Sequence, residues 1–76
     1  MVELLEELAR RLVDDPSAVR VEQVEYSDVT VLRLHVAPDD VGKVIGRQGR
    51  IARALRTVVR ATAGHGSRRV QLDIAD

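Results

Sequence analysis

The sequence predicts an α+β fold, a three-stranded sheet covered on one face by three helices, in one domain spanning residues 1–76. Two stretches place their apolar residues three and four positions apart, as amphipathic helices do. Three shorter stretches alternate apolar and polar residues, as half-buried strands do. The expected order along the chain is helix, strand, strand, short helix, long helix and strand.

The first helix is expected over residues 2–13. Its apolar residues form one stripe at i, i+3, i+4 and i+7 spacing: Leu5, Leu8, Ala9 and Leu12. Acidic residues near its start complement the positive end of the helix dipole. The helix is expected to end at Asp15-Pro16, because the residue before a proline avoids the helical conformation.

Residues 19–26 and 29–36 are expected to form two strands joined by a tight turn at Ser27-Asp28. The first strand changes phase, and either a bulge near Glu22-Gln23 or a frayed start explains the change. One face of the second strand collects Thr30, Leu32, Leu34 and Val36. The other face mixes valines with Arg33 and His35, which favours a sheet covered on one side only.

The remaining elements are two helices and a strand. A short helix starts at Pro38-Asp39-Asp40 and runs to about Ile45, and a longer one occupies roughly 49–63. One arc of the longer helix is apolar: Ile51, Leu55, Val58, Val59 and Thr62. The opposite side carries Arg53, Arg56 and Arg60. Gly64 is expected as a left-handed cap, and residues 68–74 as the last strand.

The charges are balanced in number but divided between the two halves of the chain. The net charge is zero, which argues against a generic polycation. Residues 1–40 nevertheless have a balance of −6, and residues 41–76 one of +6. The second half attracts a phosphate backbone and predicts one basic face. The same pattern also fits ordinary solvated surface, so it assigns no function by itself.

The most informative stretch is residues 44–51, Val-Ile-Gly-Arg-Gln-Gly-Arg-Ile. Its two glycines leave backbone N–H groups uncovered, and it lies at a helix start, which favours an anion. With three basic side chains nearby, the favoured anion is a phosphate within a polymer: Lys43, Arg47 and Arg50. The alternative is a plain corner between two helices.

The turn and its flanking residues resemble those of KH domains: Ile45, Gly46, Gly49 and Ile51. The predicted order of elements is that of type II KH domains. Across essentially its whole length the chain is most similar to the KhpA (YlqC) family of small bacterial RNA-binding proteins. The resemblance implies an RNA chaperone or post-transcriptional regulator that clamps the backbone of single-stranded RNA.

The resemblance also implies a groove for about four unstacked nucleotides, walled by the two central helices and the second strand. The RNA-binding residues carried over onto this chain are Val41, Gly42, Lys43, Ile45, Gly46, Arg47, Gln48, Gly49, Arg50, Ile51 and Arg53. Ile45 and Ile51 are expected to belong at least partly to the core. The implied protein partners are a second copy and a KhpB (Jag/EloR-like) RNA-binding protein. The third helix is the candidate contact surface.

Other functional classes have little support. The chain has no cysteine, no clustered histidines and no Walker-type loop, so no enzyme, cofactor or metal site is predicted. No signal peptide and no apolar run of ~18 residues is found, so no membrane contact and a cytoplasmic location are expected. Tyr26 is the only aromatic residue, which disfavours recognition by base stacking. The neutral charge and the acidic first half leave a second hypothesis open, a protein-interaction module with little RNA binding of its own.

Overall fold

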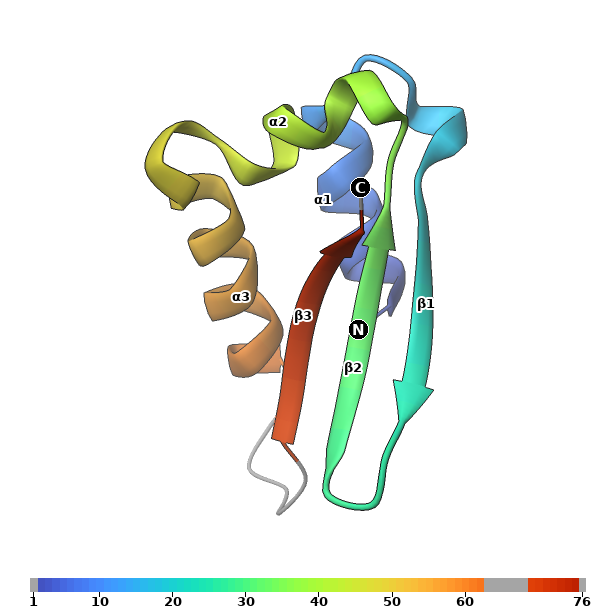
Figure 1. Ribbon diagram of the computed structural model, residues 1–76, viewed down its shortest axis with the longest axis vertical. Coiled ribbons are helices and arrows are strands. Elements are labelled where there is room, and N and C mark those ends of the chain that lie inside the picture. Colours follow the sequence, from blue (N-terminus) through green and yellow to red (C-terminus); the bar gives the residue numbers. More distant parts are fainter. Residues whose placement is uncertain (1, 63–68, 76) are drawn as a thin grey trace.

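The computed structural model describes residues 2–62 and 69–75, and Figure 1 shows its three helices and three strands. The helices are α1 (Val2–Leu12), α2 (Val41–Ile45) and α3 (Arg50–Thr62). The strands are β1 (Arg20–Glu25), β2 (Val29–His35) and β3 (Arg69–Ala75). Short 3₁₀ helices precede β1, α2 and α3: Pro16–Ala18, Pro38–Asp40 and Arg47–Gly49. No helix in the described ranges has the length and apolar character of a membrane span.

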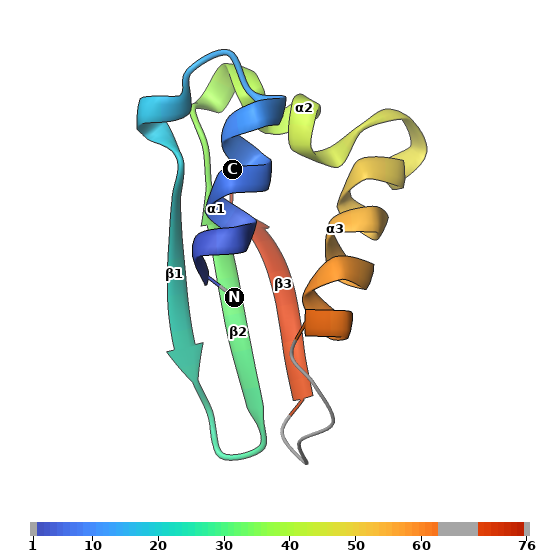
Figure 2. The ribbon, with the colours of Figure 1, turned by 180° about the vertical axis from the view of Figure 1, so that it is seen from behind.

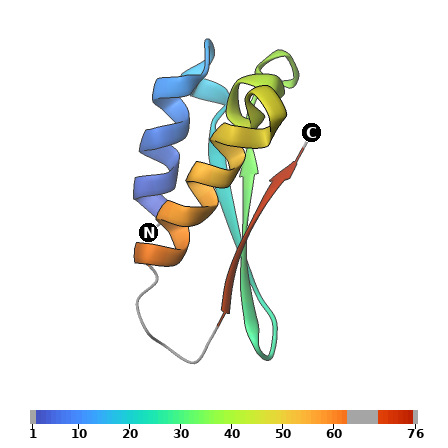
Figure 3. The ribbon, with the colours of Figure 1, turned by 90° about the vertical axis from the view of Figure 1, so that its left-hand side faces the viewer.

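The sheet is mixed, with the strand order β1-β2-β3. β1 and β2 form an antiparallel hairpin, and β2 and β3 are parallel because α2 and α3 carry the chain back between them. Figures 2 and 3 show α1 and α3 on the same face of the sheet, with the other face open. The predicted α+β fold and its one-sided sheet are confirmed.

The core lies between that face and the helices, and every α-helix and strand except β1 contributes a buried apolar side chain. Its buried members include Leu5, Ala9, Leu32, Leu34, Val44, Leu55, Val59 and Leu72. Val44 is completely buried, so the short helix α2 is held to the core through one side chain. This contact fixes the position of the chain just before the glycine turn.

The predicted apolar faces of the two longer helices are wrong at one residue each. Leu12 is exposed at the end of α1, and Val13 just beyond the helix is buried in its place. Thr62 is exposed at the end of α3, whereas Ala52 near its start is buried. Both errors fall where a helix starts or ends, because helical periodicity fixes a face only within the helix.

The bulge predicted in the first strand is also wrong. β1 pairs with β2 without interruption, from Arg20 opposite His35 to Glu25 opposite Thr30. Val19 is buried but lies before the strand begins, which agrees with the alternative of a frayed start. The valines of β1 change phase because Val21 lies on the core face and Val24 on the open face of a regular strand.

The turn predicted at Ser27-Asp28 is confirmed, with the amide of Tyr26 donating to the carbonyl of Val29 at 2.8 Å. The cap predicted at Gly64 lies outside the described residues.

Candidate nucleic-acid interface

The glycine turn forms the corner between α2 and α3, at the edge of the molecule beyond the sheet (Figure 1). The amide of Gly46 donates to the carbonyl of Gly42 at 2.9 Å and closes the last turn of α2. The amide of Gly49 donates to the carbonyl of Gly46 at 3.1 Å and closes the turn itself. Arg47 and Gln48 lie at the tip, where both side chains are exposed.

The backbone of the turn is left-handed at three positions. Gly46 has φ of 77° and Gly49 φ of 73°, which glycine adopts without steric cost. Gln48 has φ of 59°, a conformation that costs a residue with a Cβ roughly 1–2 kcal/mol. Glycine commonly adopts this conformation, whereas nothing in the sequence indicates it for Gln48.

The strained turn leaves backbone donors uncovered. Within residues 2–62 and 69–75, the amides of Arg47 and Gln48 have no backbone hydrogen-bond partner. They precede the first turn of α3, where the helix dipole adds positive potential. Backbone amides exposed at the start of a helix are suited to bind a phosphate oxygen.

The two glycines differ in what surrounds them. A Cβ on Gly46 would lie 2.7 Å from Cγ1 of Ile51, so the side chain of Ile51 covers this residue. Ile51 is half-buried and packs against the core, as the sequence predicts. A Cβ on Gly49 would meet nothing within 4 Å. Gly49 therefore leaves the outer side of the turn open.

The face of α2 that precedes the turn carries aliphatic residues and, at Gly42, no side chain. Ile45 is 38 % exposed, one of the few large apolar side chains that reach solvent. Val41 is half-buried, and a Cβ on Gly42 would have no neighbour within 4 Å. The predicted residues of α2 thus precede the turn, and they combine an uncovered backbone at Gly42 with the aliphatic side chains of Val41 and Ile45.

Lys43 differs from the free point charge that the sequence suggests. Its Nζ lies 3.3 Å from Oδ2 of Asp14 and 3.5 Å from Oδ1 of Asp40. The hydrogen bond to Asp14 raises the pKa of Lys43 above its ordinary value, and Asp40 adds to the effect. In the structure the charge of Lys43 is therefore paired with two acids of the same chain.

Asp40 is the centre of this structural contact and was missed at the sequence level. Its side chain is buried, and Oδ2 accepts a hydrogen bond from the amide of Asp15 at 3.0 Å. Burial alone raises the pKa of Asp40, but hydrogen bonds from the amides of Asp15 and Asp14 and the contact with Lys43 outweigh it and hold that pKa below its usual value. Asp40 thereby fastens the start of α2 to the chain that follows α1.

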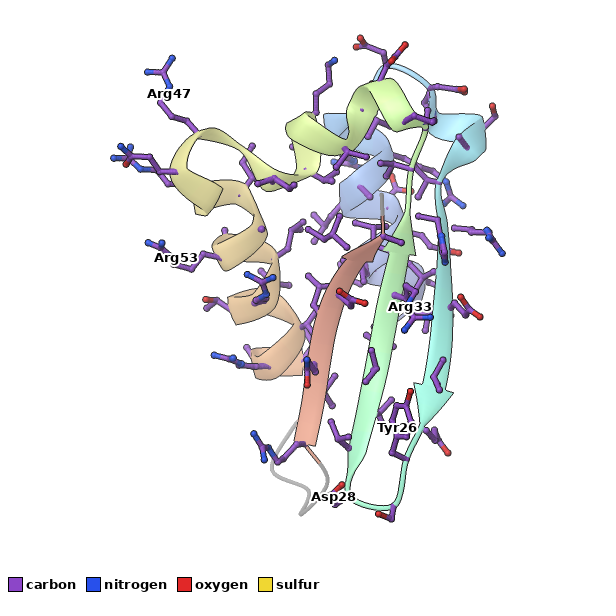
Figure 4. All side chains as sticks on the ribbon, in the orientation of Figure 1. Tyr26, Asp28, Arg33, Arg47 and Arg53 are labelled. Atoms are coloured by element: carbon purple, nitrogen blue, oxygen red, sulfur yellow. The ribbon has the colours of Figure 1, made fainter. Side chains whose placement is uncertain are left out.

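The arginines of the turn are not compensated in this way. Figure 4 shows Arg47 and Arg53 pointing away from the body of the molecule on the same side. Arg50 makes one long hydrogen bond, from Nη2 to Oε1 of Gln48 at 3.4 Å. None of these three arginines forms an ion pair with a residue that the structure describes. Their charges are free to meet an external anion.

On the open face of the sheet, two pairs of polar side chains meet across strands. Nε of Arg33 lies 3.3 Å from Oδ2 of Asp73, and Nε2 of His35 lies 3.0 Å from Oε1 of Glu22. The hydrogen bond from His35 lowers the pKa of Glu22. By register Arg20 and Arg69 lie on this face too, and neither forms an ion pair with a residue that the structure describes, so unpaired positive charge is found here as well as on the turn and α3.

One expected wall of the groove is corrected by the fold. The resemblance implies a groove walled by the two central helices and the second strand. In the structure, β3 is the edge strand that lies next to α3, and β2 is the central strand (Figure 1). The parallel crossover inserts β3 between β2 and the helix, which alternation of residues within each strand does not predict.

These features can be compared with known proteins. A family model described as the KH domain of KhpA/KhpB matches residues 2–74. The chain belongs to the KhpA/KhpB KH-domain family. The RNA-binding protein KhpA of Clostridium acetobutylicum is 50 % identical over 74 residues, covering 97 % of this chain and 99 % of that protein. The KhpA of Halalkalibacterium halodurans is 51 % identical over 76 residues and covers both chains completely.

Solved structures support the same fold at much lower identity. Aquifex aeolicus Era bound to GDP and AlF4⁻ gives a TM-score of 0.57 at 14 % identity, covering 97 % of this chain and 30 % of that one. Era in complex with MgGDPNP and nucleotides 1506–1542 of 16S ribosomal RNA gives a TM-score of 0.52 at 19 % identity, covering 96 % and 28 %. At such identities the likeness concerns the fold alone.

Proposed function

We propose that this protein binds single-stranded RNA in the cytoplasm, with the turn at Gly46–Gly49 clamping the sugar-phosphate backbone. The observation that carries the proposal is the pair of amides at Arg47 and Gln48, which have no backbone partner within the described residues and belong to exposed residues near arginines without acidic partners. Phosphate oxygens satisfy both the amides and the guanidinium groups. The names of the KhpA relatives support RNA as the ligand.

The bases of the bound strand lie along the face of α2 that carries Val41, Gly42 and Ile45. Ile45 and Val41 supply aliphatic contact, and Gly42 allows a sugar or base to approach the helix backbone. Without aromatic platforms, each base gains little, so one domain binds weakly and with modest sequence preference. This chemistry suits an RNA chaperone or a post-transcriptional regulator that acts on many RNAs.

A salt titration tests the phosphate clamp. Binding of a fluorescent single-stranded RNA is measured at several salt concentrations. The logarithm of the affinity is expected to fall linearly with the logarithm of salt, by roughly 0.7 for each phosphate neutralised. An affinity that does not respond to salt contradicts a clamp made of charges and amides.

A second candidate is a protein-interaction module, and exposed leucines on α1 favour it. Leu4, near the start of α1, is 39 % exposed, and Leu12, at the end of the same helix, is 36 % exposed. Partners of this kind include a second copy of the chain and a KhpB protein, which the shared KhpA/KhpB family model supports. Contact through α3 stays a prediction.

Capture of partners from a cell lysate, with and without ribonuclease, separates the two candidates. Partners that disappear after ribonuclease treatment support RNA binding as the primary activity. Partners that all survive the treatment support the interaction module.

A further inference from the structure

The face of the sheet that packs against the helices becomes polar towards the hairpin between β1 and β2. Three successive rows of residues across the strands lie on this face: Val21, Leu34 and Ile74, then Gln23, Leu32 and Leu72, then Glu25, Thr30 and Val70. The first row is wholly apolar, whereas the third contains a carboxylate and a hydroxyl. In Figure 2, β1 and β2 continue past the start of α1, so this helix leaves the polar end of the face uncovered.

A cavity of about 270 Å³ lies where α1 begins above this part of the sheet. Its lining is half apolar and half polar: Val2, Leu32 and Val70, with Glu3, Gln23 and Thr30. None of these residues is among those assigned to RNA binding. The glycine turn lies beyond α2, near the other end of α1 (Figure 2). The cavity is therefore separate from the candidate nucleic-acid interface.

Thr30 brings an unpartnered polar group into the cavity. It is only 7 % exposed, and its hydroxyl forms no hydrogen bond with a residue that the structure describes. Every side-chain oxygen or nitrogen that is shielded from solvent in the described ranges does have a partner. The hydroxyl is therefore reached from the cavity that Thr30 lines. A ligand there supplies the hydrogen bond that the protein does not.

The other polar groups of the cavity are acceptors. Nε2 of Gln23 donates to Oε1 of Glu25 at 3.1 Å, which leaves the amide oxygen of Gln23 to accept. The carboxylate of Glu3 accepts only, and the hydroxyl of Thr30 both accepts and donates. No lysine or arginine of the described ranges lines the cavity. Its chemistry therefore calls for a ligand with several donors.

Glu3 also differs from the other glutamates of α1. Glu6 and Glu7 pair with Arg10 and Arg11, each one turn further along the helix. Glu3 forms no ion pair with any residue in the part of the chain that the structure describes. Its position in the first turn suits the helix dipole, but the dipole does not require a glutamate that lines a cavity.

We propose that this cavity binds a primary ammonium group carried on a short aliphatic chain. An ammonium group has three donors and no acceptor, and the oxygens of Glu3, Gln23 and Thr30 accept them. The aliphatic chain packs on Leu32 and Val70. Small alkylamines and the lysine side chain of another protein share this chemistry. A metal ion would use the oxygens but gain nothing from the apolar lining.

Titration of isotope-labelled protein with n-butylammonium chloride, followed by NMR, tests the site. We expect saturable shifts of the amide resonances of Glu3, Gln23 and Thr30. Two further probes each lack one half of the ligand: n-butanol has the chain without the charge, and ammonium chloride has the charge without the chain. Each is expected to bind about tenfold more weakly or less, because either the charged hydrogen bonds or the apolar contacts are lost.

Two variants remove the polar contacts one at a time. Glu3→Gln is expected to weaken the binding of n-butylammonium about tenfold, and Thr30→Val, which has nearly the same shape, about fivefold. Thr30→Val is also expected to melt no lower than the wild type, since its hydroxyl has no hydrogen bond to lose. The matched control Glu7→Gln removes an acid from α1 outside the cavity and is expected to bind as the wild type does.

A second arm distinguishes the two sources of the ligand. A short peptide with one lysine is titrated beside the same peptide with norleucine in its place. Tighter binding of the lysine peptide than of n-butylammonium identifies a protein partner, and the reverse order identifies a small amine. Either result supports the site, provided that the norleucine peptide does not bind.

Three outcomes overturn the proposal. Shifts that spread evenly over Glu3, Glu6 and Glu7 without saturation show only counter-ions along an acidic helix. Equal binding of n-butanol and n-butylammonium shows an apolar hollow without recognition of charge. Unchanged affinity in folded Glu3→Gln and Thr30→Val shows that the amine binds elsewhere. None of these results bears on RNA binding, because the cavity shares no residue with the turn.

Discussion

The side chain of Ile51 lies directly over the bare Cα of Gly46, where a Cβ would come within 2.7 Å of Cγ1. This contact joins the first residue after α2 to the first turn of α3 and holds the corner in shape. The first glycine of the turn is thus required by the fold itself. The second, Gly49, also has a positive φ, but a Cβ there would meet no atom within 4 Å. Packing therefore does not require glycine at this position.

Replacing Gly46 by alanine is expected to lower the free energy of unfolding by about 2 kcal/mol or more, because the left-handed φ and the overlap with Ile51 add together. Denaturant unfolding measures the loss. The matched change, Gly49→Ala, meets only the penalty of its φ and is expected to cost about 1 kcal/mol. Equal losses for the two variants contradict the distinction between them.

Gly42 offers the reverse case, a glycine that nothing in the fold requires. It lies within α2, and a Cβ would meet no atom within 4 Å. Gly42→Ala is expected to raise the free energy of unfolding by about 1 kcal/mol, since alanine is the better helix former. The same change is expected to weaken RNA binding, because the new methyl group stands where the strand approaches. A variant that is more stable and binds RNA as well as the wild type removes Gly42 from the site.

Substitutions of Lys43 and Arg47 are expected to have different effects, the first on the stability of the fold and the second on RNA binding. Lys43→Gln breaks the contacts with Asp14 and Asp40, so its melting temperature is expected to fall while the salt slope of RNA binding stays unchanged. Arg47→Gln leaves the fold intact and is expected to reduce the slope by about 0.7, the value of one phosphate contact. A large loss of slope in the lysine variant means that Lys43 leaves its acids to reach the RNA.

The lowered pKa of Asp40 predicts how the free energy of unfolding depends on pH. A carboxyl group with a lowered folded-state pKa stabilises the fold above its unfolded pKa of about 3.9, and this contribution is lost as the pH falls through the folded-state pKa. Asp40→Asn is expected to be less stable than the wild type at neutral pH. The difference is expected to shrink below about pH 4, where Asp40 becomes protonated in the wild type too. Unfolding curves of both proteins across this range give the difference directly, and a constant difference argues against the charge as its cause.

Much of the fold can be predicted from local patterns. The stripe on α1, the alternation in β2 and the arc on α3 each depend on one period within one element, and Leu5, Leu34 and Leu55 are buried as predicted. The glycine turn and its flanking isoleucines also stand out locally, because glycine spacing and the following helix are read from consecutive residues. These are the features for which a short stretch of sequence determines the structure.

The features that the sequence did not predict are not local. Lys43 is compensated by Asp14, an acid that comes almost thirty positions earlier and is brought near only by packing α1 beside α2. The left-handed Gln48 is imposed by the need to close the corner, not by a preference of glutamine. The place of β3 next to α3 depends on the parallel crossover, which no single element predicts. Each requires the assembled fold.

The central claim is that the tip of the glycine turn holds the RNA backbone, and a pair of matched double variants tests it most directly. Arg47→Glu with Gln48→Glu places two acids at the tip, and Arg20→Glu with Gln23→Glu makes the same chemical change on β1. Equilibrium binding of single-stranded RNA is measured for both variants, with melting curves to establish that they are folded. We predict that the first variant loses binding while the second keeps most of it. A folded first variant that binds RNA as tightly as the second contradicts the account.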